Sequence, residues 1–202
     1  MAVLLKNITF WYKKPLFDSL SFEFKSGEIS CIYGLNGTGK STLIYIINGE
    51  INLKRGKVYI DSNLKIGTML QFPENLIYNK TVYDEIFTFT SSKEKTEKII
   101  DELNIRGIKD INPLVISEGQ KRIIFIRSIL EVFDVAILDE PFASLDMDMK
   151  KIIKNMFVDF KNLKKTVIYT TNRKIDTDIA DNILELNNER RDNLLGEKGS
   201  SG

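Results

Sequence analysis

A glycine-rich segment that begins at Gly34 combines the residue types that hold phosphate groups. It reads Gly34-Leu-Asn-Gly-Thr-Gly-Lys40-Ser41 and follows an apolar run, Ile29 to Tyr33, that is typical of a buried strand. Glycines let backbone amides approach a phosphate, and the N-terminus of a following helix favours negative charge. The Lys40 ammonium can reach the terminal phosphates, and the Ser41 hydroxyl can be a magnesium ligand. The alternative is a glycine turn before an unrelated helix. The residues that we expect to bind nucleotide here are Gly34, Asn36, Gly37, Thr38, Gly39, Lys40, Ser41 and Thr42.

Two adjacent carboxylates follow a second apolar run, Val135 to Leu138. Asp139, beside a phosphate loop, can hold magnesium through water, and Glu140 can orient the attacking water or accept its proton. Apolar runs that end in Asp-Glu are common, so the pair gains its meaning from the phosphate loop upstream. Together the two motifs predict a nucleotide-hydrolysing enzyme, with Glu140 as a catalytic residue.

A third motif, Ile116-Ser-Glu-Gly-Gln120, precedes the carboxylates in the chain. Ser117 is a suitable N-cap and Glu118 suits a first helical turn, so a capped helix alone would explain these residues. In this order with the other motifs, the segment resembles the signature motif of the ABC ATPase family, usually Leu-Ser-Gly-Gly-Gln. The continuation from Lys121 to Leu130 also resembles the family's signature helix.

The resemblance runs from Leu4 to about Leu186 and implies further roles. Tyr12 matches the aromatic residue that stacks on adenine, although packing in the core is an alternative for Tyr12 and Trp11 is a rival for the stacking role. Gln71 matches the glutamine that senses magnesium and the attacking water. Ala143-Ser-Leu-Asp146 matches the loop that couples two subunits.

The family also implies ligands and assembly. ATP and Mg²⁺ would be bound between two cassettes that face each other head to tail, as a homodimer or a heterodimer. Ser117, Gly119 and Gln120 would then act on the nucleotide of the partner cassette. The magnesium would be held by Ser41, Asp139 and Gln71.

Two residues depart from the family pattern. Glu118 stands where glycine is usual, and we expect its side chain to point outward, where the helix dipole favours it. Asn172, in Thr171-Asn172, stands where the family has its switch histidine, and the chain contains no histidine. Losing one transition-state donor typically costs about 10²-fold in rate. We therefore expect ATP binding with slow hydrolysis at this chain's own site, where Glu140 is intact.

The stretch from Gln71 to Glu85 is similar to ATPases of energy-coupling-factor and cobalt importers. The apolar residues Phe72, Leu76, Ile77 and Tyr78 suit a groove for a membrane subunit's coupling helix, or a plain loop with core-facing anchors. The alternatives are a regulatory subunit with little turnover, and an ABC ATPase of translation or repair, whose second cassette or long coiled coil the chain lacks.

Composition agrees with a peripheral ATPase subunit. The 202 residues, 43% of them apolar, suit one domain with a filled core, and the net charge of +1 gives no electrostatic case for nucleic acid. One cysteine, Cys31, is expected in the core and fits a reducing compartment. No secretory pattern is present, and no apolar run approaches the roughly 18–20 residues of a membrane helix. We expect a location in the cytoplasm, on the inner face of the cell membrane.

The elements that must position these residues alternate between strands and helices. This alternation predicts an α/β fold: a phosphate-loop NTPase core with a mainly parallel sheet, an N-terminal antiparallel β subdomain and an inserted α-helical subdomain at about 82–133. We expect one nucleotide-binding domain at 1–190 and a flexible tail at 191–202. The predicted strands are Leu4–Tyr12, Leu20–Phe24, Ile29–Tyr33, Val58–Ile60, Ile66–Leu70, Val135–Leu138, Thr166–Thr170 and Ile183–Leu186. The predicted helices are Lys40–Asn48, Val82–Phe89, Glu94–Leu103, Glu118–Val132 and Met147–Leu163.

Overall fold

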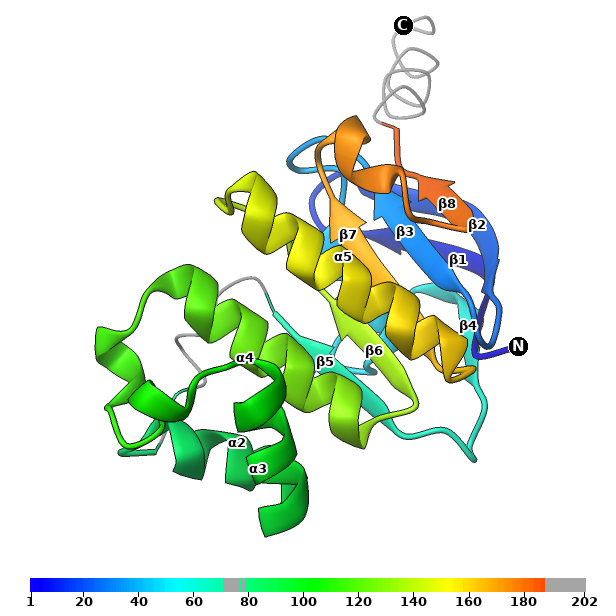
Figure 1. The fold of residues 1–202 in the computed structure, drawn as a ribbon. Helices are drawn as coiled ribbons and strands as arrows, with labels where there is room; N and C mark the ends of the chain where they lie inside the picture. The colour runs from blue at the N-terminus through cyan, green and yellow to red at the C-terminus, as the bar shows by residue number, and fades with distance from the viewer. Residues whose placement is uncertain (71–76, 78, 188–202) are drawn as a thin grey trace, which may run out of the picture.

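The computed structural model describes residues 1–70, 77 and 79–187. Figure 1 shows two sheets on one side of the molecule and a group of helices on the other, with a long helix crossing in front of the larger sheet. Gln71, Phe72, Leu76 and Tyr78, which the sequence assigns to a magnesium sensor and a docking groove, lie outside the described residues, as does the predicted tail. Among the described helices none is long and apolar enough to cross a membrane.

The N-terminal part forms a three-stranded antiparallel sheet in the order β2-β1-β4. Its strands are β1 (Val3–Trp11), β2 (Pro15–Phe24) and β4 (Arg55–Ile60). The sequence placed the start of β2 at Leu20, five positions too late. Register shifts along the β1–β2 pairing and a positive φ of 52° at Ser19 interrupt the alternation there. The period-2 pattern therefore reaches only the second half of the strand.

The central sheet is wholly parallel in its pairings, with the order β5-β6-β7-β3-β8. Its strands are β3 (Ile29–Tyr33), β5 (Ile66–Met69), β6 (Val135–Leu138), β7 (Thr166–Thr171) and β8 (Asn182–Glu185). Because β6 and β3 both flank β7, the segments that follow these three strands meet at one edge of the sheet. This edge is where the predicted chemical groups gather.

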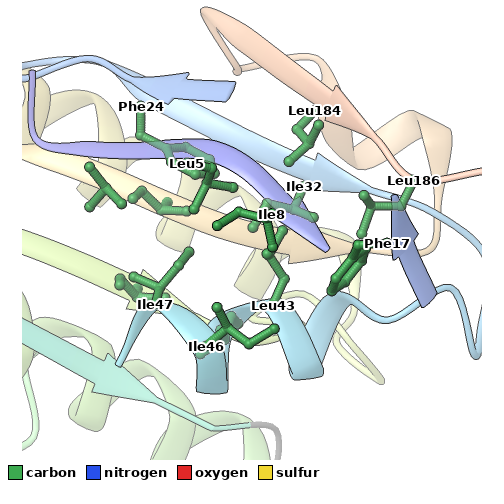
Figure 2. Close-up of a cluster of buried hydrophobic side chains, with 14 of the residues drawn as sticks. Leu5, Ile8, Phe17, Phe24, Ile32, Leu43, Ile46, Ile47, Leu184 and Leu186 are labelled. Atoms are coloured by element: carbon green, nitrogen blue, oxygen red, sulfur yellow. The ribbon is translucent and has the colours of Figure 1, made fainter. Parts of the chain in front are cut away.

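One face of the central sheet packs against the antiparallel sheet and α1 (Lys40–Ile47). Figure 2 shows Leu43, Ile46 and Ile47 of α1 directed toward side chains of both sheets, among them Ile8 and Ile32. All five side chains are buried. The helix that begins at the phosphate loop is therefore fixed by the core directly beneath it.

The other face is covered by α4 (Glu118–Val132) and α5 (Met147–Asn162), whose apolar residues pack on β3, β6 and β7. A third, smaller apolar cluster joins α4 to α2 (Val82–Thr90) and α3 (Lys93–Glu102). Helix α4 contributes to both clusters, with Ile126 in the first and Ile124 in the second. It joins the helical segment to the sheet, and Phe89 of α2 also packs against the cluster on the sheet.

Candidate nucleotide site

The glycine-rich loop links the end of β3 to the start of α1, as the sequence predicts. Gly39 caps the helix with a φ of 103°, a left-handed conformation that favours glycine, and an added Cβ would lie 2.9 Å from Leu16 and Phe17. At Gly34 an added Cβ would lie 2.5 Å from Thr38 Oγ1 and 2.7 Å from the Leu186 oxygen. Both glycines are thus required by the close packing of the loop against its neighbours.

Lys40 is nearly buried, and its ammonium is directed back over the loop. Its Nζ donates hydrogen bonds to the carbonyl oxygens of Gly34, at 2.9 Å, and Leu35, at 3.3 Å. The same nitrogen lies 3.3 Å from Glu140 Oε1. The structure therefore brings together the predicted phosphate-binding lysine and the predicted catalytic carboxylate.

Ser41 and Asp139 are joined by a hydrogen bond of 2.7 Å from the hydroxyl to Asp139 Oδ2. The other carboxylate oxygen, Oδ1, accepts a hydrogen bond of 2.5 Å from the Thr170 hydroxyl on β7. Asp139 is buried, so these donors compensate for its removal from water. Thr170 was missed by the sequence reasoning. Its only signal was a hydroxyl near the end of a predicted buried strand.

The backbone at Glu140 adopts a left-handed conformation, with a φ of 48°. Its amide donates a hydrogen bond of 2.8 Å to Thr170 Oγ1, which fixes the turn after β6. A non-glycine residue in this region stores roughly 1–3 kcal/mol of strain, and such strain concentrates at functional sites. The turn directs the Glu140 carboxylate toward Lys40.

A hollow of about 450 Å³ lies over the phosphate loop. Tyr12 is 60% exposed, so the alternative that it packs in the core is wrong; its ring meets Phe10 edge-on at 4.9 Å between centroids. Trp11 is also exposed but lies outside the lining, and the Lys54 ammonium lies 5.9 Å from the centre of its ring. The lining consists of Tyr12, Leu16, Asn36, Gly37, Gly39, Lys40, Ser41, Thr42 and Glu140.

Asn172 follows the end of β7 and reaches the phosphate loop. Its Nδ2 donates a hydrogen bond of 2.8 Å to Asn36 Oδ1, and the Gly34 amide donates one of 3.2 Å to the Thr171 oxygen. The residue that the sequence predicts at the switch-histidine position therefore contacts the phosphate loop through a neutral amide. Its contact residue, Asn36, is in the lining of the hollow.

The signature segment begins α4 with a capping box. Ser117 Oγ accepts from the Gln120 amide at 3.2 Å, and Gln120 Oε1 accepts from the Ser117 amide at 3.1 Å. Glu118 is exposed on the first turn, as expected. Ser117, Gly119 and Gln120 are absent from the lining of the hollow, so the structure does not bring the signature to this chain's own phosphate loop.

Gly119 is buried against the loop that follows the carboxylates. An added Cβ there would lie 2.2 Å from Met149 Sδ and 3.3 Å from Leu145 Cδ2. The Arg122 guanidinium also donates a hydrogen bond to the Ala143 carbonyl oxygen. Sequence reasoning missed Met149 and Arg122, because contacts between segments far apart in the chain leave no local pattern. These contacts join the signature and its helix to Ala143–Asp146 and to the start of α5.

Comparison with known proteins agrees with this geometry. Residues 17–143 match the family model described as ABC transporter. The energy-coupling factor transporter ATP-binding protein EcfA1 of Fusobacterium nucleatum is 30% identical, covering 92% of this chain and 79% of its own length. EcfA2 of Streptococcus sanguinis is 29% identical, covering 94% and 80%.

A solved structure shares the fold. CbiO1 from Clostridium perfringens, described as part of the ABC transporter complex cbiONQ, has a TM-score of 0.80 at 24% identity, covering 91% of this chain and 84% of that one. The matched family model spans the phosphate loop, the signature segment and both carboxylates. The chain belongs to the ABC transporter family, as one of its ATP-binding, ATP-hydrolysing cassettes.

Proposed function

We propose that this chain powers an importer of the energy-coupling-factor type, as one half of a head-to-tail pair of cassettes. The observation that carries the proposal is the meeting of Lys40 and Glu140, 3.3 Å apart, in a hollow that Tyr12 also lines. The likeness to EcfA1 and EcfA2 supports the type of importer. The transported substrate would be selected by other subunits.

ATP binding at this site is proposed to use the lining residues in distinct roles. The exposed Tyr12 ring offers an apolar face to adenine. The loop amides and the N-terminus of α1 favour the phosphates, and the Lys40 ammonium would exchange its carbonyl contacts for phosphate oxygens. Thr42, also in the lining, would complete the loop around the phosphate groups, while Thr38 lies outside the lining and donates from its hydroxyl to the Leu35 carbonyl oxygen at 2.9 Å.

The donor set fits a magnesium ion. Ser41 and Asp139 present a hydroxyl and a carboxylate oxygen within 2.7 Å of each other, and Mg²⁺ prefers oxygen ligands. Gln71 would be the third residue of this set. When bound, the ion would neutralise charge that develops on the phosphate oxygens. Thr170 holds Asp139 in place through Oδ1, which leaves Oδ2 directed to Ser41.

Glu140 is proposed to orient the attacking water and accept its proton. Its turn is fixed by the bond from its amide to Thr170, so the carboxylate is positioned before substrate binds. Asn172 can donate to the γ-phosphate but supplies no positive charge, which supports slow turnover at this site. Asn36 would hold the Asn172 amide near the loop.

The partner cassette would receive the signature of this chain. Ser117, Gly119 and Gln120 lie outside the chain's own hollow, which supports action on a nucleotide held by a second cassette.

An exposed apolar surface lies just before the signature. Ile111, Leu114 and Val115 are 40%, 60% and 74% exposed. This apolar surface supports contact with a second protein, and a membrane subunit is the partner we propose. The cassette would then work in the cytoplasm, on the inner face of the cell membrane.

The test combines turnover with assembly. We expect Glu140→Gln to abolish hydrolysis and to yield an ATP-dependent dimer, with itself or with a partner cassette, in size-exclusion chromatography. Lys40→Ala is the matched control, because it removes phosphate binding and should prevent that dimer. If Glu140→Gln formed no ATP-dependent dimer, either with itself or with a partner cassette, the result would contradict the proposal. Copurification with an integral membrane subunit tests the transporter role.

A regulatory subunit with little turnover is the second candidate, and Asn172 favours it. ATPase activity of the chain alone, and then with partner cassettes, separates the two. Fast turnover by the chain alone would contradict the slow site. Turnover that stays absent in every pairing would favour regulation.

A further inference from the structure

A buried ion pair lies on the face of the central sheet that α5 covers, outside the lining of the hollow. The Lys150 ammonium is 3.0 and 3.1 Å from the two carboxylate oxygens of Asp176, and both side chains are 4% exposed. Lys150 is in the first part of α5, and Asp176 is in the 3-10 helix η4 (Lys174–Thr177), which follows Asn172 closely. Figure 1 shows η4 at the end of β7, on the side of the sheet where α5 crosses. Taking two charges out of water is costly, so such a pair is weak evidence for a stabilising role.

The segment after Asn172 is held at Asp176 from several directions. The Tyr169 hydroxyl donates a hydrogen bond of 2.7 Å to the Asp176 carbonyl oxygen. The Asp176 amide donates one of 3.0 Å to the Arg173 oxygen, and Arg173 Nε lies 3.9 Å from Asp176 Oδ2. Asn172 is thus in a short turn whose two ends are fixed, by β7 and by Lys150.

The same part of α5 also contacts the signature helix. Met149, next to Lys150, has its sulfur against Gly119, and Asp146 caps α5 by accepting from the Met149 amide at 2.8 Å. One turn of helix is therefore in contact with the signature on one side and with the Asn172 segment on the other.

We propose that Lys150 and Asp176 are positioning residues for Asn172. The two contacts from one ammonium to both carboxylate oxygens fix where η4 sits along α5, and so keep Asn172 against Asn36. An apolar pair of similar size would fill the space but would not fix the direction. A displacement of about 1 Å at a reacting centre can cost roughly 10²-fold in rate. The proposal rests on the proposed function, because it requires Asn172 to act in turnover.

The decisive variant replaces both charges, Lys150→Met with Asp176→Leu, in the full chain. Apolar replacement of a buried pair is often neutral for stability, so we expect a melting temperature close to that of the unmodified protein. We expect kcat, measured with Mg·ATP in the cassette dimer, to fall at least about 10-fold, because Asn172 would be displaced from its position near the reacting phosphate. The ATP dissociation constant, measured by isothermal titration calorimetry, should change less than about 2-fold, because no nucleotide-binding group is altered.

The matched control is the pair Lys154 and Asp178, which joins the same helix to the residue just after η4 but is more exposed, with Asp178 at 56%. We expect Lys154→Met with Asp178→Leu to leave kcat unchanged. Asn172→Ala is measured beside it. If Asn172→Ala lowers kcat and the Lys150–Asp176 variant does not, the positioning role is overturned and the proposed function stands. An unchanged kcat for Asn172→Ala would instead overturn the role of Asn172, and the positioning role with it.

A further variant covers failure to fold. Asp176→Glu keeps both charges, so that no buried charge is left uncompensated, and moves the carboxylate by one methylene group relative to the backbone. We expect a several-fold fall in kcat with an unchanged dissociation constant for ATP. An unchanged kcat in this folded variant would also overturn the proposal.

Discussion

At the scale of single residues, Asn172 stands where the resemblance to the family would place a switch histidine. It supplies a hydrogen-bond donor to Asn36 and no charge. A histidine there would add the only imidazole in the chain, since the sequence contains none. The residue therefore offers a test in which a substitution adds function.

We expect Asn172→His to raise kcat, by about 10-fold or more, because a charged donor stabilises the transferring phosphate better than a neutral one. An imidazolium is charged below its pKa, near 6.5 when unperturbed, and nearby phosphate raises that pKa. The gain over the unmodified protein should therefore be largest at low pH and be lost as the pH rises through that pKa. The measurement is a kcat profile from pH 5.5 to 9 for both proteins.

Asn172→Gln is the control for that profile, because it keeps a neutral amide and adds no titrating group. If Asn172→His and the unmodified protein had the same kcat at every pH, the residue at position 172 would not limit turnover.

Gly119 is the second residue that makes a separable prediction. An added Cβ at 2.2 Å from Met149 Sδ requires the thioether to move, so we expect Gly119→Ala to destabilise the fold by about 1–3 kcal/mol. Urea denaturation measures the loss. Adding Met149→Ala should restore part of it, and no restoration would show that Met149 is not the obstacle.

At the scale of elements, α4 contributes to two apolar clusters, one on the central sheet and a smaller one with α2 and α3. We expect the smaller cluster to open without the other. Ile100 of α3 is fully buried in the smaller cluster with α2 and α4. We expect Ile100→Ala to increase hydrogen exchange of amides at 82–105, while those of β3 and β7 stay protected, because local openings need less free energy than global unfolding. Ile168→Ala, in the sheet core, is the control and should raise exchange throughout. If Ile100→Ala raised exchange at β3 and β7 as much as Ile168→Ala does, the smaller cluster would not open by itself and the prediction would be wrong.

The elements were largely predictable because each has a strong local pattern. The bounds of β3, β6 and α4 agree with the sequence prediction, since apolar runs and a capping serine mark them. The start of β2 was missed, because bulges disrupt its alternation. The phosphate loop and carboxylates were predictable for the same local reason. Thr170 and Met149 were not, because their roles arise from contacts between segments far apart in the chain.

At the scale of the whole molecule, burial of the Cys31 thiol makes the stability of the fold depend on pH in the alkaline range. Cys31 is buried in β3, and burial raises the pKa of its thiol to about 12, with a hydrogen bond to Tyr169 acting in the opposite direction. In the unfolded chain the thiol ionises near pH 8.5. Above that pH the unfolded state binds fewer protons than the native state, so stability falls as the pH rises.

We expect the free energy of unfolding to decrease between about pH 9 and 12, with this thiol contributing roughly 1.4 kcal/mol per pH unit. Other groups also titrate there, so the comparison is with Cys31→Ala, which should show a shallower decrease in urea denaturation across that range. Identical slopes for the two proteins would contradict the assignment.

The burial of Cys31 has a practical consequence for spectroscopy. It is the only cysteine in the sequence, and its side chain is fully buried. A thiol-reactive dye added to the folded cassette would therefore find its target only at a cysteine that has been introduced on the surface. Val115, 74% exposed just before the signature, is a suitable position. Distances between labelled cassettes can then be followed during turnover with the native thiol left in place.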